Sequence, residues 1–251
     1  MNNVLVIDIG NTNITIGLFK GERIIKKLKI PTNSCYQYGK CCAGVFRFAG
    51  LDDEDALDVV VSSVVPLALA RFITELNKTV KCGITIVGRD RIAPIRNLYK
   101  IKSEVGQDRL VNAYAARQLY GAPCIIVDFG TAITFDVVSP KGEYLGGLIL
   151  PGIEMSLSSL YKKTALLPRV ELKPATSIIG RDTVNSMRAG LLFGLGAMCD
   201  GLSTQYRKIL GKKTRIIATG GNAGLIKRYA KSIQIVDEDL TLKGLRLISN
   251  L

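Results

Sequence analysis

The sequence predicts an α/β fold made of two similar halves, each containing a mixed β-sheet. An apolar run that ends in Asp-x-Gly occurs at residues 4–10 and again at residues 124–130. Each copy is followed by a second β-rich run and then by Lys-Gly-Glu, at residues 20–22 and 141–143. Strand-like and helical segments then alternate in both halves, which is typical of mixed sheets covered by helices. A repeat of this length indicates a duplicated domain.

The first half is expected to open with three short strands whose turns lie at Gly10 and Gly21. Pro66 suits the first position of a helix, and Gly121 is a natural helix stop. The strands predicted in this half cover residues 4–9, 14–19, 23–30, 57–61 and 84–87, and the helices cover 35–48, 66–78 and 108–120.

The second half repeats this plan and adds a long helix over residues 183–210. Asp182 is its candidate N-cap, because a carboxylate can accept hydrogen bonds from the first N–H groups of a helix. Gly190, Gly194 and Gly201 fall near one face of this helix and would permit close helix packing. The other predicted strands cover residues 124–127, 133–138, 144–150, 214–218 and 233–236, and the other helices cover 153–164, 223–230 and 238–250.

The two predicted domains are residues 1–120 and 121–251, packed closely around one central cleft because no low-complexity linker separates them. The chain has 251 residues, of which 47% are hydrophobic and 22% charged, so it can fill a core and is not disordered. No apolar stretch approaches the roughly 20 residues needed to cross a bilayer. The N-terminus runs directly into a strand, without the basic region of a signal peptide. We therefore expect a cytoplasmic protein with no membrane partner.

Histidine is absent from the chain, which excludes Ser-His-Asp and Cys-His catalysis. Any general base must be Asp, Glu, Lys, Tyr or Cys. The six cysteines form no CxxC pair, so a zinc site of the usual spacing is not expected. We interpret these cysteines as reduced and structural.

The formal net charge is +13. Binding to nucleic acid would explain such a charge. However, the basic residues are spread over many segments, and there are few aromatic residues on which bases could stack. We favour a basic surface that attracts small anionic molecules, and we expect no nucleic-acid partner.

The segment Asp8-Ile9-Gly10-Asn11-Thr12 has the composition of a phosphate-binding turn. Gly10 has no side chain, so a phosphate could approach the backbone N–H groups, while Asn11 and Thr12 add donors. Asp8 would face a phosphate-bound Mg²⁺ through water. The same residues are common in ordinary hairpin turns, and for one copy alone that interpretation would prevail.

The second copy, Asp128-Phe129-Gly130-Thr131-Ala132, makes the phosphate interpretation much stronger, because two unrelated turns would rarely share the same pattern. Thr131 can donate to a phosphate, and Asp128 is a second candidate cation ligand. The glycine pair Gly220-Gly221 follows another strand and could receive the adenosine end of a nucleotide at a helix N-terminus. The chain contains neither GxxxxGK[ST] nor a GxGxxG after a strand, which disfavours P-loop and Rossmann sites.

The segment Gly106-Gln107-Asp108-Arg109 opens a predicted helix. An Asp at this place is often only a helix cap, and the sequence alone does not decide between a cap and a catalytic base. As a base, Asp108 would take a hydroxyl proton during phosphoryl transfer. Arg109 could then hold an anionic substrate or the transferred phosphoryl group.

Together these motifs resemble those of the type III pantothenate kinases, members of the superfamily of actin, hexokinase and heat-shock chaperones. The resemblance covers essentially the whole chain. Gly-x-Asp-Arg is the discriminating element, because Asp-Gly hairpins occur more widely in the superfamily. The matching segments are Asp8 to Thr12, Gly106 to Arg109, Asp128 to Ala132, Gly146-Gly147-Leu148-Ile149-Leu150-Pro151-Gly152 and Gly180-Arg181-Asp182-Thr183.

The resemblance implies two tandem ribonuclease H-like (actin-like ATPase) domains. It implies phosphorylation of pantothenate by ATP, the first step of coenzyme A biosynthesis. Asp108 would be the catalytic proton acceptor. The implied ATP-binding residues are Asp8, Ile9, Gly10, Asn11, Thr12, Asn13, Ile14, Thr15 and Thr131, and the implied substrate-binding residues are Tyr99, Gly106, Gln107, Asp108, Arg109 and Thr183.

The resemblance also implies that Asp128 binds a monovalent cation, K⁺ or NH₄⁺, while Mg²⁺ accompanies ATP. It implies a homodimer, and the glycine-rich face of the helix over residues 183–210 is the candidate for close packing in it. Two alternatives stay open. One is a non-catalytic transcriptional accessory protein of the same family, and the other is a different kinase or phosphatase of the superfamily.

Overall fold

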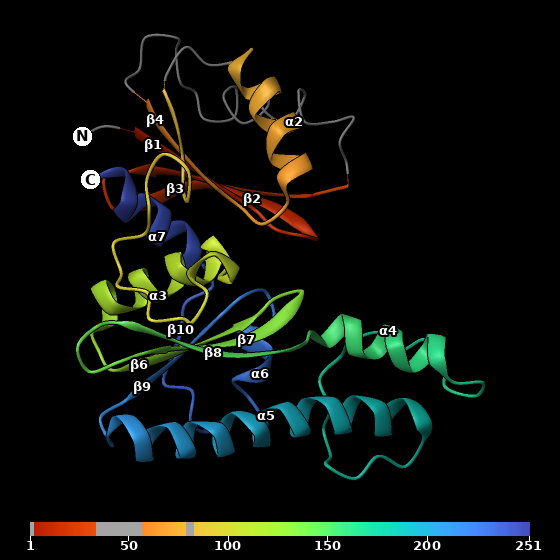
Figure 1. Ribbon diagram of the computed structural model, residues 1–251. Helices are drawn as coiled ribbons and strands as arrows, with labels where there is room; N and C mark the ends of the chain where they lie inside the picture. The colour runs from red at the N-terminus through yellow and green to blue at the C-terminus, as the bar shows by residue number, and fades with distance from the viewer. Residues whose placement is uncertain (1–2, 34–56, 79–82) are drawn as a thin grey trace. The chain divides into compact units, whose positions relative to one another are not determined.

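The computed structural model describes residues 3–33, 57–78 and 83–251 (Figure 1). The helix predicted over residues 35–48 lies outside these ranges. The chain forms two compact units. The first comprises Met1–Pro94, Ile101–Ala115 and Thr241–Leu251, and the second comprises Ile95–Lys100 and Ala116–Leu240. These units are interleaved along the chain, and the domain boundary predicted at residue 120 stays a prediction.

The first unit is built on a five-stranded mixed sheet in the order β3-β2-β1-β4-β5. Strand β1 pairs antiparallel with β2 and parallel with β4, β2 pairs antiparallel with β3, and β4 pairs parallel with β5. The strands are β1 Asn3–Ile9, β2 Asn13–Lys20, β3 Arg23–Pro31, β4 Leu57–Ser63 and β5 Ile84–Ile86.

Helix α2, Pro66–Asn77, covers one face of this sheet (Figure 1). Pro66 occupies the start of the helix as predicted, where its missing N–H costs no hydrogen bond. Phe72 and Leu76 of α2 pack on alternate residues of β1, such as Ile7 and Ile9. The intervening residue, Asp8, therefore points to the opposite face, because successive side chains of a strand alternate.

The first unit also contains the 3₁₀ turn η2, Lys102–Glu104, the beginning of α3, Gln107–Tyr120, and most of α7, Leu240–Ser249. The hydroxyl of Thr241 donates to Oδ1 of Asn112 in α3 at 2.7 Å. The guanidinium of Arg246 donates to the carbonyl of Gly21 at 2.7 Å. The C-terminal helix is thus fixed to elements that lie far away in the sequence.

The second unit repeats the sheet, with the order β10-β9-β6-β7-β8. Strand β6 is antiparallel to β7 and parallel to β9, as β1 is to β2 and β4. This equivalence confirms that the sequence repeat is also a repeat of the fold. The strands are β6 Cys124–Phe129, β7 Ala132–Val138, β8 Tyr144–Pro151, β9 Arg215–Thr219 and β10 Ile235–Val236.

Helices α4 (Ile153–Lys163), α5 (Thr183–Leu210) and α6 (Ala223–Ile226) contribute to the main core of the second unit. Helix α5 has the predicted bounds, and Asp182 is its N-cap, accepting a hydrogen bond from the N–H of Asn185 at 2.8 Å. The helix predicted over residues 223–230 is shorter, because the N–H groups of Arg228 and Tyr229 bond three residues back, to Leu225 and Ile226. The chain tightens there into a turn.

The glycines of α5 that are predicted to permit close helix packing have no packing partner in the described part of the chain. A side chain at Gly190, Gly194 or Gly201 would meet no atom of the chain within 4 Å. Instead, Gly196 is the buried glycine, and a Cβ there would overlap the carbonyl of Tyr229. Within the described residues, the predicted glycine face is therefore uncovered.

Two of the cysteines, Cys124 and Cys199, are buried and carry free thiols. Burial raises the pKa of each thiol to about 12. A thiol with such a pKa is almost fully protonated at neutral pH and is a poor nucleophile. This supports a structural role for these two cysteines. Among the described residues, no helix is both long and apolar enough to span a membrane.

Candidate active site

The first Asp-Gly hairpin joins β1 to β2, and its turn is held by several hydrogen bonds. The N–H of Gly10 donates to the carbonyl of Asn13 at 3.0 Å. Thr32, directly after β3, donates from its hydroxyl to the carbonyl of Gly10 at 2.7 Å and from its N–H to the carbonyl of Thr12 at 3.0 Å. The turn is thus a fixed backbone frame of the kind that a phosphate site requires.

The predicted ATP-binding residues of this hairpin fall into two groups. Asn11 and Thr12 are exposed, and Asp8, Asn13 and Thr15 are partly buried. The side chains of Ile9 and Ile14 are fully buried in the core of the first unit. These two residues could therefore meet a nucleotide only through their backbone.

The second hairpin, between β6 and β7, places Asp128 opposite Thr134, as the first places Asp8 opposite Thr15. A Cβ on Gly130 would lie 3.2 Å from Oδ1 of Asp128, and a Cβ on Gly220 would overlap the same oxygen. The carboxylate therefore occupies space that two glycines leave open. One of them, Gly220, belongs to the glycine pair that is predicted to receive the adenosine end of a nucleotide.

Parallel pairing places a hydroxyl side chain beside each of the two hairpin carboxylates, and the motifs alone do not predict these neighbours. Ser62 of β4 lies beside Asp8, and Thr219 of β9 lies beside Asp128. Both side chains are almost fully buried. The strand register is the signal that reveals them, and the register is not readable from either segment alone.

The Gly106–Arg109 segment forms the start of α3. Asp108 is the second helical residue, and its Oδ1 accepts a hydrogen bond from the N–H of Arg109 at 2.8 Å. A Cβ on Gly106 would lie only 2.5 Å from the same oxygen. A glycine at this position therefore permits the conformation of the Asp108 carboxylate.

Two opposing effects set the acidity of Asp108. Burial raises its pKa above the ordinary value, because an ionised carboxylate loses hydration. The hydrogen bond from the N–H of Arg109 and the positive charge of Arg109 oppose this rise. Burial is the larger effect, so Asp108 binds a proton more tightly than an ordinary Asp does. A more basic carboxylate is better suited to accept a proton during catalysis.

We expect the pH profile of kcat/KM to report this raised pKa. A base must be deprotonated to act, so activity should rise with pH through the pKa of Asp108. The midpoint of the acidic limb should lie above about 3.9, the value of an unperturbed Asp. Initial rates measured across the acidic range would test this. A midpoint of the acidic limb at or below that value would contradict the prediction. The pH profile of the Asp108→Asn variant would show which part of the acidic limb is due to the Asp108 carboxylate.

Tyr99 lies in the second unit, within the segment Ile95–Lys100. Its N–H donates to Oδ1 of Asn97 at 2.9 Å. Its ring lies against the backbone of β8 at Gly146, where a Cβ would be 3.0 Å from Cδ2 of the ring. The side chain is partly buried and therefore partly open to a ligand.

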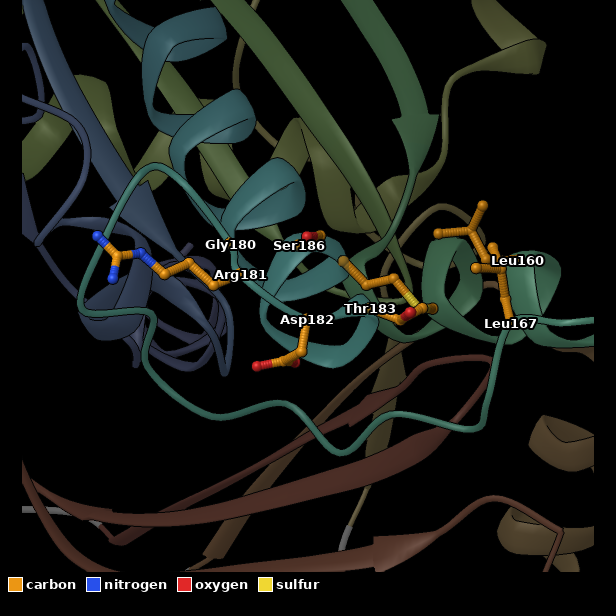
Figure 2. Close-up of a pocket in the computed structure, with 8 residues that line it drawn as sticks. Leu160, Leu167, Gly180, Arg181, Asp182, Thr183 and Ser186 are labelled. Atoms are coloured by element: carbon orange, nitrogen blue, oxygen red, sulfur yellow. The ribbon is translucent and has the colours of Figure 1, made fainter.

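Thr183, the first residue of α5, lines a pocket of about 630 Å³ (Figure 2). The pocket has apolar walls and polar groups at the helix start. The guanidinium of Arg181 extends away from the space beside Thr183, and the carboxylate of Asp182 is occupied in capping α5 (Figure 2). The lining residues are Leu160, Leu167, Gly180, Arg181, Asp182, Thr183, Ser186 and Met187.

The predicted site residues are thus divided between the two units. The first unit holds the hairpin of Asp8 and the helix start of Asp108. The second unit holds Asp128, Thr131, Tyr99 and Thr183. The position of Tyr99 is the least expected of these, because its segment, Ile95–Lys100, is separated in the chain from the rest of the second unit by Ile101–Ala115, which belongs to the first unit.

Comparison with known proteins gives the same family from two directions. Residues 4–205 match a family model described as type III pantothenate kinase. Over 248 residues the chain is 41% identical to a type III pantothenate kinase from Myxococcus xanthus strain DK1622, and the match covers 98% of this chain and 97% of that protein.

Two solved structures are similar in fold at low sequence identity. The ethanolamine utilization protein EutJ from Carboxydothermus hydrogenoformans has a TM-score of 0.58 at 13% identity, covering 99% of this chain and 90% of its own. The activator of 2-hydroxyisocaproyl-CoA dehydratase from Clostridium difficile has a TM-score of 0.51 at 13% identity, covering 99% and 93%. Together with the two mixed sheets, these neighbours confirm the predicted actin-like ATPase fold.

Proposed function

The chain belongs to the type III pantothenate kinase family, and we propose that its reaction is carried by the two Asp-Gly hairpins, the start of α3, Tyr99 and Thr183. The enzyme transfers a phosphoryl group from ATP to pantothenate and forms 4′-phosphopantothenate, the first step of coenzyme A biosynthesis. The observation that supports the proposed base most directly is the partly buried carboxylate of Asp108, held at the first turn of α3 beside Arg109.

Asp108 accepts the proton of the terminal hydroxyl of pantothenate. The hydroxyl oxygen forms a bond to the γ-phosphorus of ATP, and the bond from that phosphorus to the bridging β,γ oxygen breaks, so ADP leaves. Arg109 supplies positive charge next to the base, where it stabilises the negative charge of the transferred phosphoryl group. Gly106 and Gln107 complete the substrate loop on the same helix start.

The hairpin from Asp8 to Thr15 binds the phosphates of ATP, and Thr131 of the second hairpin adds a hydroxyl donor. The exposed side chains of Asn11 and Thr12 and the fixed backbone of the turn are suited to phosphate oxygens. Mg²⁺ that accompanies ATP would neutralise part of the phosphate charge. Asp8, at the end of β1, is the carboxylate that would hold its hydration shell.

Asp128 is the ligand of a monovalent cation, K⁺ or NH₄⁺. The fit rests on the charge of this carboxylate and on Gly130 and Gly220, where a Cβ would crowd or overlap its Oδ1. The two glycines thus allow the carboxylate to keep the position from which it would bind the cation. A monovalent cation at Asp128 would offset part of the negative charge of the ATP phosphates, in addition to the Mg²⁺ that accompanies ATP.

Tyr99 and Thr183 contact pantothenate. The pocket at Thr183 combines leucine and methionine walls with hydroxyl groups, which suits a molecule that carries both methyl and hydroxyl groups.

The uncovered glycine face of α5 is the surface for close packing of a second copy. Sedimentation equilibrium would test this homodimer, because a species of monomer mass at working concentration would contradict it. We also propose that the protein acts in the cytoplasm.

A panel of hydroxyl acceptors tests the substrate directly. Pantothenate, a hexose and other small alcohols would each be offered with ATP, with and without K⁺, and ADP formation would be measured. We expect pantothenate to be the preferred acceptor and K⁺ to raise the rate. Preference for a hexose would overturn the substrate assignment, and an unchanged rate without K⁺ or NH₄⁺ would overturn the cation.

A further inference from the structure

The segment that carries Tyr99 is fastened to strand β8 by backbone hydrogen bonds. The N–H of Tyr144 donates to the carbonyl of Arg96 at 2.9 Å, and the N–H of Leu98 donates to the carbonyl of Tyr144 at 2.9 Å. Arg96 also forms an ion pair with Glu143, with 2.9 Å between Nη1 and Oε1. Residues 96–98 thus lie alongside the start of β8 and are bonded to it.

Tyr144, the strand residue that holds this segment, is itself fixed by a buried network. Its side chain is fully buried, and its hydroxyl donates to Oδ1 of Asp136 in β7 at 2.8 Å. The hydroxyl of Thr134 donates to the other oxygen of Asp136 at 2.9 Å. Asp136 is also fully buried. A buried carboxylate with hydrogen-bonded partners has one strongly preferred geometry, so these hydrogen bonds hold the start of β8 rigidly in place.

Gly146 lies two residues further along β8 and forms the surface beneath the ring of Tyr99. A Cβ on Gly146 would be 3.0 Å from Cδ2 and 3.1 Å from Cε2 of that ring. The φ angle of Gly146 is +113°, which a residue with a side chain adopts only at a cost. The backbone N–H of Tyr99 donates to Oδ1 of Asn97. Gly146 thus contacts the ring of Tyr99, and Asn97 fixes the backbone that carries it.

We propose that Gly146 and Asn97 are positioning residues, which place the Tyr99 side chain for its contact with pantothenate. This inference rests on the proposed contact of Tyr99 with the substrate. It assigns a role to Gly146, part of the glycine-rich segment 146–152 that the proposed reaction leaves unexplained. Neither residue needs to touch pantothenate for this role.

The first test compares Gly146→Ala with Gly211→Ala. Gly211 also has a positive φ, of +105°, but a Cβ there would meet no atom within 4 Å. The control therefore reproduces the backbone strain without the ring contact. We expect Gly146→Ala to raise the KM for pantothenate about 5–10-fold and to leave the KM for ATP unchanged, because a misplacement of ~1 Å can cost ~10²-fold and this one is smaller. Gly211→Ala should leave both KM values unchanged.

A double-mutant cycle with Tyr99→Ala shows whether the effect passes through the ring. Tyr99→Ala alone should raise the KM for pantothenate, and adding Gly146→Ala to it should raise that KM no further. The same factor in both backgrounds would overturn the positioning role of Gly146. An unchanged KM in Tyr99→Ala would overturn the substrate contact of Tyr99, and the inference with it. A raised KM in Tyr99→Ala, with a normal KM in Gly146→Ala, would overturn the inference alone.

Thermal unfolding of each variant is measured alongside the kinetics. If Gly146→Ala does not fold, Asn97→Ala tests the same arrangement through the backbone of Tyr99, since it removes the acceptor of the Tyr99 N–H. We expect Asn97→Ala to raise the KM for pantothenate several-fold, with a normal KM for ATP. Unchanged values for both substrates in a folded Asn97→Ala would overturn the proposal.

Discussion

Asp108→Asn is expected to lower kcat by about 10²–10⁴-fold, the usual contribution of a positioned general base. Asn has nearly the shape of Asp but cannot accept the hydroxyl proton. The side-chain oxygen can still accept the hydrogen bond from the N–H of Arg109, so the start of α3 should keep its structure. The KM for ATP should stay near its normal value. Phosphopantothenate formation under saturating substrates measures the effect.

Asp58→Asn is the matched control, because Asp58 is an exposed carboxylate of β4 in the same unit. It should retain normal kcat. Near-normal turnover of Asp108→Asn would remove Asp108 from the role of base and would leave it as a helix-start residue. Equal thermal unfolding temperatures of the two variants would show that any loss of activity is chemical and not a loss of folded protein.

Asp128→Ala is expected to abolish activation by K⁺ and to weaken the use of ATP on the order of 10–100-fold. Both effects should appear together, because the cation at Asp128 acts on the ATP phosphates. Rates measured at increasing K⁺, at several ATP concentrations, separate the two. Asp128→Asn keeps the size of the side chain and removes its charge. It should behave like Asp128→Ala if charge is what binds the cation.

Glu171→Ala serves as the control for the loss of one negative charge from the second unit. Glu171 is exposed and pairs only at the surface, with Lys173. Exposed pairs of this kind contribute about 0–1 kcal/mol, so this variant should keep the stability and the K⁺ response of the normal enzyme. Full K⁺ dependence in Asp128→Ala would show that the cation is bound elsewhere.

Local signals were sufficient for much of the fold. The start of α5 follows from the Asp182 cap, which is a property of adjacent residues. The two hairpins were predicted from a repeated pattern of strand, Asp-x-Gly and strand. The residues Asp8, Asp128 and Asp108 could be named for the same reason, because each lies in a short motif whose chemistry is complete within a few positions.

Packing partners that are distant in the chain could not be predicted in this way. Gly190, Gly194 and Gly201 share a helix face and stay candidates for packing against a second copy, whereas the glycine of α5 that contacts another described segment is Gly196. The reason is that periodicity shows which residues lie together on a helix and not what lies opposite them. The close approach of Gly220 to Asp128 brings the residue after β9 against the end of β6, and it depends on strand order.

The sequence by itself determined the duplicated α/β plan, the family and the carboxylates expected to carry the chemistry, because these depend on short motifs and on hydrophobic periodicity. Only the tertiary structure decided how those groups are held. It raised the pKa of Asp108 by burial, placed Gly220 against Asp128, and set the Tyr99 ring on Gly146. Each of these results from segments far apart in the chain being brought into contact, and such contacts are set by the packing of the whole unit.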